Sequence, residues 1–411
     1  MSERLKPIPA GWRWGTLGEL AEGVRGVSYH PEQLRARNDA AVTQLLRSTN
    51  IQGNQLVHED SQYVPDAIVK EKQKAKPGDL ALCMSNGSKA LVGKSAVIGS
   101  EALNSAMTVG AFCSIFKPKT GSVPSFVKQA FLSQIFQEQI DVTLAGSAIN
   151  NLKNSDIENF YFPIPPASEQ RGIAEVLSAL DEQIELTEVL VAKSKLRSKG
   201  LMADLLSCRL LQPQDVNDVL LSDVVPDVQY GISSSLDVVG VIPVLRMNNL
   251  SGGEISVSDL KYSPSSVSSN LLLHPGDVLF NRTNSMEHVG RTSIWRGQLA
   301  EATFASYLVR LKPDLRKLMS EYLVYLLEWD VHQLQMRKFA TPGVQQVNIN
   351  PTSLRRCRVC IPKSLAVQRD VVDALDSARE HVSGLRAEAA KLRLQKQGLM
   401  RDLLTGKVRV H

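Results

Sequence analysis

The sequence predicts an α+β protein with two homologous globular domains, separated by two long helices that form an antiparallel coiled coil. Two observations support this prediction. The chain of 411 residues repeats itself at an offset of about 197–199 residues, and each copy ends in a run of about 40 residues with heptad-like apolar spacing. Units of roughly 200 residues are far longer than solenoid repeats, so each copy is a domain followed by a helix, and the chain has a pseudo-two-fold internal repeat.

Matched segments make up the repeat. The stretch "KPGDLALCMSN" at 76–86 returns as "HPGDVLFNRTN" at 274–284, and "LVGKSAVI" at 91–98 returns as "HVGRTSIW" at 288–295. Further pairs at nearly the same offset are 45–51 with 244–250, 145–157 with 342–354, 162–173 with 359–371, and 199–207 with 397–405. Because both copies keep these segments in one order, the chain reads as one unit written twice.

Each copy has two parts. The first part alternates β-like runs with glycine and proline and contains helical patterns, which is typical of a small α+β domain. The second part is one helix, which begins soon after a proline in each copy. The predicted boundaries are 1–166 for the first domain, 167–210 for the first helix, 211–363 for the second domain and 364–411 for the second helix.

Both helices keep an apolar seam whose positions step by four and three residues. The seam includes, in the first helix, Ile173, Leu177, Leu180 and Ile184, and in the second, Val371, Leu375, Val382, Leu385 and Leu392. A helix of this length with so regular a seam needs a partner, and the other helix is the obvious candidate. The alternative is two independent amphipathic helices, each lying on its own domain.

Composition limits the class of protein. Hydrophobic residues make up 43% and charged residues 22%, which is ordinary for a soluble globular protein. No apolar run approaches the roughly 18–20 residues of a membrane span, and the N-terminus lacks an apolar signal core. Five cysteines spread over the chain predict reduced thiols in the cytoplasm. A net charge of +5 permits nucleic-acid binding without requiring it.

The segment that most resembles a catalytic motif is Gly93-Lys94-Ser95, which looks like the end of a phosphate-binding P-loop. Gly87 and Gly93 enclose five residues, whereas the P-loop has four, and the following stretch is β-branched instead of helical. In the second copy Lys94 is matched by Arg291 within "HVGRTSIW". The common feature of the two copies is therefore a cation beside a polar loop, and no catalytic residues are predicted.

No metal site is predicted either. Cys357 and Cys360 form a C-x-x-C pair, but no second pair or nearby histidine completes a zinc site. Residues three apart on a strand point to opposite faces, which argues against a shared metal ion, so Cys357 and Cys360 are expected to be buried strand thiols.

Several segments closely resemble the specificity subunits of type I restriction–modification systems. They are the "PGD-x-L" turn, "IPAGWRWGTLGEL" (8–20), "FPIPPASEQRGIAEVLSALDEQI" (162–184) and "KQGLMRDLLTGKVRV" (396–410). The resemblance covers almost the whole chain and the order of its parts. The second half departs from the pattern: Val367-Gln368 stands in place of Glu-Gln, Arg379 stands where the first half has Asp181, and its domain opens without Gly-Trp.

The resemblance implies a non-catalytic DNA-binding subunit that acts in phage defence. Each domain would be a target recognition domain that reads one half of a split DNA sequence, and the paired helices would set the gap. The helices would also dock two methyltransferase subunits, which bind S-adenosylmethionine, and through them restriction subunits that use ATP and Mg²⁺. Two alternatives stay open: a coiled-coil scaffold or adaptor without DNA specificity, and a P-loop NTPase.

The repeated polar loops supply the predicted DNA contacts, because Arg and Lys pair with guanine, and Asn and Gln with adenine. In the first domain these are Arg47, Thr49, Asn50, Ser85, Asn86, Ser88, Lys89, Lys94, Asn150 and Asn151. In the second they are Arg246, Asn248, Asn249, Asn281, Arg282, Thr283, Asn284, Arg291, Gln345 and Gln346. Lys94 and Arg291 keep one charge in both copies, so they are assigned to phosphate. Tyr29 and Tyr230 are further candidates.

Overall fold

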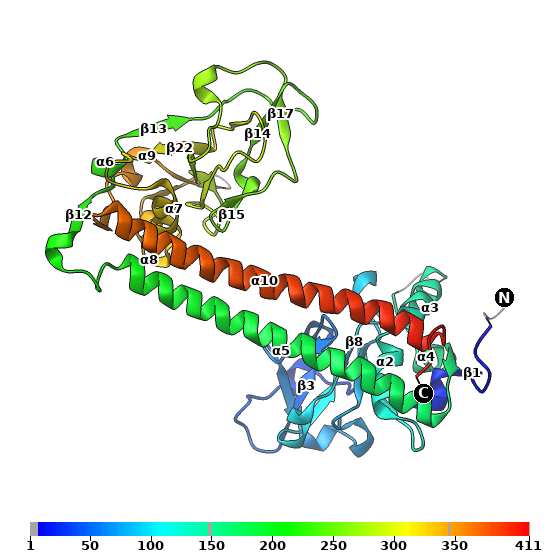
Figure 1. Cartoon of the computed structure of the whole chain (residues 1–411). Coiled ribbons are helices and arrows are strands. Elements are labelled where there is room, and N and C mark those ends of the chain that lie inside the picture. Colours follow the sequence, from blue (N-terminus) through cyan, green and yellow to red (C-terminus); the bar gives the residue numbers. More distant parts are fainter. Residues whose placement is uncertain (1–6, 147–149, 344–345, 411) are drawn as a thin grey trace. The chain divides into compact units, whose positions relative to one another are not determined.

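A computed structural model describes residues 7–146, 150–343 and 346–410. The chain forms two compact units (Figure 1). Unit 1 contains Met1–Glu188 and Ala387–His411, and unit 2 contains Val189–Arg386. Each long helix therefore contributes one half to each unit. The predicted boundaries set the helices apart from the domains, and that division stays a prediction.

Unit 1 is built on two small sheets. The first is antiparallel with the order β2-β10-β7-β8, and the second has the order β6-β3-β9, in which β3 and β9 run parallel. Two short ribbons, β1-β11 and β4-β5, complete it. The strands are β1 (Arg13–Thr16), β2 (Ala21–Arg25), β3 (Val42–Leu46), β4 (Ile51–Gln52), β5 (Gln55–Leu56), β6 (Gln62–Pro65), β7 (Leu80–Cys83), β8 (Ser95–Val97), β9 (Met107–Val109), β10 (Cys113–Pro118) and β11 (Tyr161–Ile164).

The repeated Pro-Gly-Asp turn positions strand β7. Gly78 has φ +88°, which a residue with a Cβ rarely adopts. The Asp79 carboxylate accepts a hydrogen bond from the Lys76 N–H at 2.8 Å and pairs with Lys117 Nζ at 3.0 Å. All four residues of β7 are buried, so the motif marks the entry to a central strand.

Short helices cover the first sheet of unit 1. They are α1 (Leu17–Leu20), α2 (Pro124–Phe131), α3 (Gln134–Ala145) and α4 (Asn154–Glu158). Their apolar faces join the core through aromatic contacts: the ring centroids of Phe116 and Phe131 are 5.1 Å apart, and those of Phe131 and Phe136 are 5.2 Å apart. The helices α2 and α3 are separate because Ser133 caps the start of α3, where its hydroxyl accepts from the Phe136 N–H.

Unit 2 has sheets of the same order, β13-β22-β18-β20 and β17-β14-β21, with β14 and β21 parallel. It also has the ribbons β12-β25 and β15-β16 and a small sheet β19-β24-β23. The strands are β12 (Val216–Leu220), β13 (Asp227–Tyr230), β14 (Ile242–Leu245), β15 (Leu250–Ser251), β16 (Glu254–Ile255), β17 (Lys261–Ser263), β18 (Val278–Asn281), β19 (Thr283–Asn284), β20 (Thr292–Ile294), β21 (Thr303–Phe304), β22 (Leu308–Lys312), β23 (Ala340–Pro342), β24 (Val347–Ile349) and β25 (Arg358–Pro362).

The short helices of unit 2 match those of unit 1 in order. They are α6 (Leu221–Val224), α7 (Ser320–Glu328), α8 (Asp330–Arg337) and α9 (Pro351–Leu354). The helix α7 lies almost entirely in the core, with Tyr322, Leu323, Leu326 and Leu327 fully buried. Cys357 is buried and Cys360 is half-buried on the β25 side of this core.

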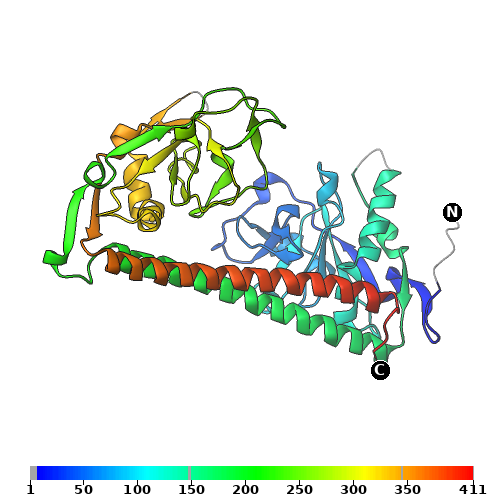
Figure 2. The same ribbon diagram turned by 45° about the horizontal axis from the view of Figure 1, so that its top comes forward.

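The two long helices are α5 (Ala167–Leu206) and α10 (Leu365–Leu404), each of 40 residues. Within each unit, their two halves lie side by side and run in opposite directions (Figure 1, Figure 2). In unit 1, Ile173 and Leu177 share one core with Leu403. In unit 2, Leu206 shares a core with Leu375. No helix in the described part of the chain is long and apolar enough to cross a membrane.

The predicted seam positions face inward. Ile173, Leu177, Val371, Leu375 and Val382 are buried, whereas Leu180, Ile184, Leu385 and Leu392 are half-buried. The halves also pack on the domain of their own unit, so in each unit the helix halves and the domain contribute to one apolar core.

Candidate nucleic-acid interface

In both units, a central strand runs into a polar loop that is closed in the same way. In unit 1, the N–H of Gly93 donates to the Cys83 carbonyl at 2.9 Å, and the N–H of Cys83 donates to the Lys94 carbonyl at 2.9 Å. In unit 2, Gly290 and Arg291 make the equivalent pair of bonds with Asn281, each at 2.8 Å. Residues 84–92 and 282–289 are thus held as matched loops at the ends of β7 and β18.

This closure rules out the P-loop interpretation. The N–H of Gly93, which would have to face a phosphate, is used by the Cys83 carbonyl. Gly93 has φ +84°, and a Cβ there would lie 2.7 Å from a side-chain carbon of Ile140, so the glycine is needed for the loop itself. Strand β8 follows at Ser95 instead of a helix.

In unit 1, three of the predicted loops meet. Asn86 Nδ2 donates to Ser48 Oγ at 3.1 Å, which ties the loop after β7 to the turn after β3. Asn150 Nδ2 donates to the Gly87 carbonyl at 3.3 Å, and Ser85 forms a β-bridge with Asn151. Residues far apart in the sequence therefore form one polar surface, which we call the loop surface of unit 1. Ser48 was not among the residues predicted from the sequence.

Unit 2 has an equivalent loop surface, built partly as strands. Thr283 pairs with Asn348 and Asn284 with Val347 across β19 and β24, and Gln346 is exposed beside them. Gln345 lies outside the described residues. The Arg282 guanidinium stands 5.3 Å from the centroid of the Tyr230 ring and donates to the Ser306 carbonyl at 3.3 Å. Nothing in the spacing of the sequence predicted that Arg282 would lie over the Tyr230 ring.

Three of the predicted base-reading residues are not available for that role. Asn50 is 1% exposed; its amide donates to the carbonyls of Val57 and Glu59, and its oxygen accepts from the Arg47 N–H. Asn249 is held in the same way in unit 2. Asn281 is fully buried behind the loop, with Nδ2 at 3.4 Å from the His288 carbonyl. These amides shape the loops, because a buried side chain cannot meet a base edge.

The remaining predicted side chains differ in exposure and in hydrogen bonding. Thr49, Ser88 and Lys89 are exposed. Arg47 donates to the Asp60 carbonyl at 2.9 Å, whereas Arg246 and Asn248 both bond to the Asp259 carboxylate, at 3.0 and 2.7 Å. In unit 2 the turn at 246–249 is therefore held by the Asp259 carboxylate. Arg246 and Asn248 would have to share these hydrogen bonds with DNA in order to contact it.

The two cations assigned to phosphate lie near helices. Lys94 is exposed and lines a cavity of about 610 Å³ with Gln134 at the start of α3 and Arg401 on α10. Arg291 is half-buried, with its guanidinium 2.9 Å from His288 Nδ1. Glu328 lies nearby and accepts from the Thr292 N–H at 2.6 Å; burial raises the pKa of its carboxyl group. The phosphate role of Lys94 and Arg291 stays a prediction.

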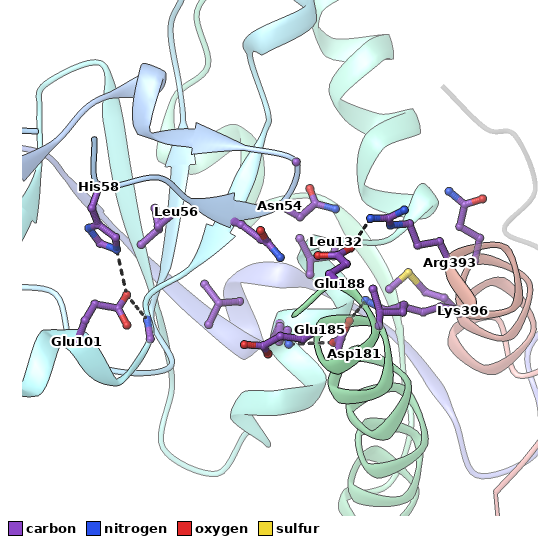
Figure 3. A pocket seen from close by; sticks show the side chains of 18 residues that line it. Asn54, Leu56, His58, Glu101, Leu132, Asp181, Glu185, Glu188, Arg393 and Lys396 are labelled. Atoms are coloured by element: carbon purple, nitrogen blue, oxygen red, sulfur yellow. Dashed lines mark hydrogen bonds and ion pairs between the residues drawn. The ribbon is translucent and has the colours of Figure 1, made fainter. Parts of the chain in front are cut away.

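On the side facing the helices, unit 1 has a cavity of about 620 Å³ lined by charged residues (Figure 3). Asp181 on α5 pairs with Lys396 at 2.5 Å and with Lys128 at 2.9 Å, and Arg393 pairs with Glu188. Burial acts to raise the pKa of Asp181, but hydrogen bonds from the two lysines outweigh it and lower this pKa. Because the cations of α10 already have partners, this surface is a junction between helices and domain.

The corresponding junction in unit 2 is built around Arg379, one of the residues at which the second half departs from the family pattern. Arg379, which replaces Asp181 in the pattern, pairs with Glu254 at 3.0 Å and stands 4.5 Å from the centroid of the Tyr325 ring. Tyr325 donates to the Asp376 carboxylate at 2.5 Å. In unit 2 the junction therefore holds the hairpin β15-β16 through Glu254, whereas in unit 1 Asp181 joins α5 to α2 and α10. Among the described residues, no group of three or more His, Cys, Asp or Glu side chains is arranged to hold a metal ion.

Two units with the same strand order in their main sheets each carry a matched polar loop surface. Residues 9–193 match the model of the type I restriction modification DNA specificity domain. The chain is 30% identical over 299 residues to the specificity subunit of the type I restriction enzyme EcoKI from Escherichia coli, covering 69% of this chain and 64% of that protein. It is 27% identical to the StySPI specificity subunit from Salmonella potsdam, covering 89% and 81%.

Solved structures agree in fold. One chain from a study of assembly and conformational transition in a type I R-M system has a TM-score of 0.61 at 18% identity, and the match covers 98% of this chain and all of that one. The type I S subunit from M. genitalium has a TM-score of 0.58 at 14% identity, covering 98% of each chain. The chain is a member of the type I restriction–modification specificity subunits, as its motifs predicted.

Proposed function

We propose that this chain is the DNA specificity subunit of a type I restriction–modification complex and that it has no catalytic activity of its own. The observation that carries the proposal is the convergence of separate polar loops into one surface on each of two units of equal strand order. Each loop surface reads one half of a split DNA target. Exposed Lys89 and half-buried Arg282 supply donors of the kind that pair with guanine.

The two units descend from one duplicated domain, and helices α5 and α10 act as an antiparallel coiled-coil spacer between the half-sites. The matched loop closure at Gly93 and Gly290 supports the duplication. The buried seam residues support the pairing of the helices. A helix rises about 1.5 Å per residue, so the length of the spacer sets the gap in the DNA target.

The exposed apolar side chains of α5 are the docking points for two methyltransferase subunits, and restriction subunits join through them. Leu186 in unit 1 is 58% exposed and Leu196 in unit 2 is 73% exposed, although both stand on long helices. S-adenosylmethionine, ATP and Mg²⁺ belong to these partner subunits, and the complex works in the cytoplasm.

Methylome sequencing of the host, with and without this gene, tests the proposal. The expected result is one bipartite methylated motif that disappears on deletion and returns when the intact gene is restored. A non-specific coiled-coil scaffold is the alternative; for it, deletion would leave every methylated motif in place. That result would overturn the proposed function.

A further inference from the structure

Each unit presents an aromatic ring to solvent at the same place in its fold. Phe112 in unit 1 is 69% exposed, the highest value for any aromatic residue in the part of the chain that the structure describes. Tyr307 in unit 2 is 47% exposed. Phe112 lies directly before β10 and Tyr307 directly before β22, which are equivalent strands. Neither residue was predicted from the sequence.

The turns that carry these rings are the same and are tightly held. The N–H of Cys113 donates to the Gly110 carbonyl at 2.8 Å, and the N–H of Leu308 donates to the Ala305 carbonyl at 2.9 Å, so each aromatic residue is the third residue of a four-residue turn. A Cβ on Gly26 would lie 2.2 Å from the Gly110 carbonyl oxygen, so a neighbouring strand packs closely against the turn. In unit 2, a Cβ on Gly231 would likewise lie 2.1 Å from the Phe304 carbonyl oxygen and 2.7 Å from that of Ala305.

The backbone of each aromatic residue is tied to the loop surface. The Phe112 carbonyl accepts from the N–H groups of Met84 and Ser85, at 2.9 and 3.1 Å. The Tyr307 carbonyl accepts from the N–H of Arg282 at 3.0 Å. The rings therefore stand where the polar loops begin. Since each backbone is fixed and each ring is exposed, neither ring is required for the core of its unit.

The surroundings of the rings fit nucleic acid better than an apolar protein surface. Ser85 and Arg282 directly adjoin the two turns, and Asn86 and Lys89 continue the loop of unit 1. Rings placed among amide, hydroxyl and cationic donors suit duplex DNA, where an apolar side chain contacts a thymine methyl group or wedges between base steps while the donors bond to base edges. A docking site for a protein would gather several exposed apolar residues instead.

We infer that Phe112 and Tyr307 contact bases of the DNA target, one ring in each half-site. This inference rests on the proposed function. The rigid turn presents each ring in a fixed position, so little conformational entropy is lost when it meets a base. An aromatic contact carries no charge, so it adds affinity for the correct sequence without adding a phosphate contact.

The test uses the full chain assembled with its methyltransferase subunits and DNA carrying the target motif found by methylome sequencing. Phe112→Ala and Tyr307→Ala should each weaken binding to the target by roughly ten- to a hundredfold, while the slope of log Kd against log salt stays as in the wild type. Phe112→Tyr and Tyr307→Phe should restore most of the affinity. Tyr161→Ala, which removes another exposed aromatic ring from unit 1, should leave binding unchanged.

A second readout is the fluorescence of a base analogue in the DNA. With 2-aminopurine placed in turn at each position of the target, wild-type protein should change the fluorescence at one or more positions in each half-site. Phe112→Ala should abolish this change in one half-site alone, and Tyr307→Ala in the other. Specific wild-type binding with undiminished affinity in both alanine variants would overturn the inference but leave the proposed function standing. A wild-type complex with no sequence preference would overturn the proposed function itself.

Discussion

At the scale of single residues, asparagine in a polar loop has two roles that the sequence alone does not separate. Asn50 and Asn249 each follow an arginine by three residues and turn their amides inward to hold the loop, whereas Asn86 holds one loop to another. An amide satisfies buried backbone groups as well as it reads adenine, so composition predicted a polar loop but not the direction of each side chain. Both buried asparagines stand three residues after an arginine, and this spacing is a sequence signal that could have identified them.

His332 gives a prediction about stability and pH. It is 5% exposed, neither ring nitrogen has a hydrogen-bond partner, and burial lowers its pKa to about 4. The unfolded chain takes up a proton at this residue near pH 6.5, but the folded chain does so only near pH 4. The free energy of unfolding of the chain should therefore fall as pH drops from about 6.5 to 4, by up to ~3 kcal/mol from this residue.

Denaturant unfolding at pH 7 and pH 4.5 checks this prediction. His332→Phe keeps a ring beside Trp329, whose centroid lies 5.2 Å from that of His332, and removes the titration. Its loss of stability between the two pH values should be smaller than that of the wild type. The same substitution at exposed His381 serves as the control. An equal pH dependence in His332→Phe and the wild type would contradict the account.

At the scale of elements, the seam spacing predicted which faces of α5 and α10 are buried, but not that each helix divides between two units. A heptad pattern predicts that one face of a helix is buried, but either another helix or a domain can bury that face. The ion pairs at the two junctions could not be predicted from the sequence either. Asp181 and Arg379 occupy matched places with opposite charges, and each finds a partner supplied by another segment, Lys128 or Glu254.

Asp181 should contribute measurably to the stability of unit 1. Asp181→Asn removes the countercharge of both Lys128 and Lys396, and Lys396 is largely buried. We expect a loss of about 1–3 kcal/mol in thermal or denaturant unfolding at pH 7. Glu188→Gln, which breaks the more exposed pair with Arg393, should cost less than about 1 kcal/mol.

A double variant makes the Asp181 test sharper. Asp181→Asn combined with Lys396→Met should recover part of the loss, because no unpaired ammonium remains between the helices. A double variant whose loss equals or exceeds the sum of the two single losses would show that the pair is not the cause.

At the scale of the whole molecule, the resemblance and the repeat predicted the family and the kind of fold, and both agree with the comparisons. The exact faces used for DNA could not be predicted, because they depend on which loops meet. Ser48 and Asn86 are 38 residues apart in sequence and form one surface only through the packing of two sheets.

The spacer hypothesis predicts the effect of lengthening the helix. Four residues inserted into α5 near Thr187 add about one turn, or 6 Å. The methylated motif of the host should then keep both half-sites and have a longer gap between them. An insertion of the same residues into the exposed loop at Gly121 should leave the motif unchanged. A changed half-site with an unchanged gap would rule out the role of the helices as a spacer.

The central claim is that the two units read their half-sites independently, and competition binding with Arg282→Ala tests it most directly. Arg282 belongs to the loop surface of unit 2 and remains partly exposed. The wild-type and variant complexes are compared on DNA altered in one half-site at a time, at two salt concentrations. The account predicts that the variant loses discrimination in one half-site only, by about 1–3 kcal/mol if Arg282 pairs with guanine, and keeps full discrimination in the other. Altered preference in both half-sites, or an equal loss on every sequence, would contradict it.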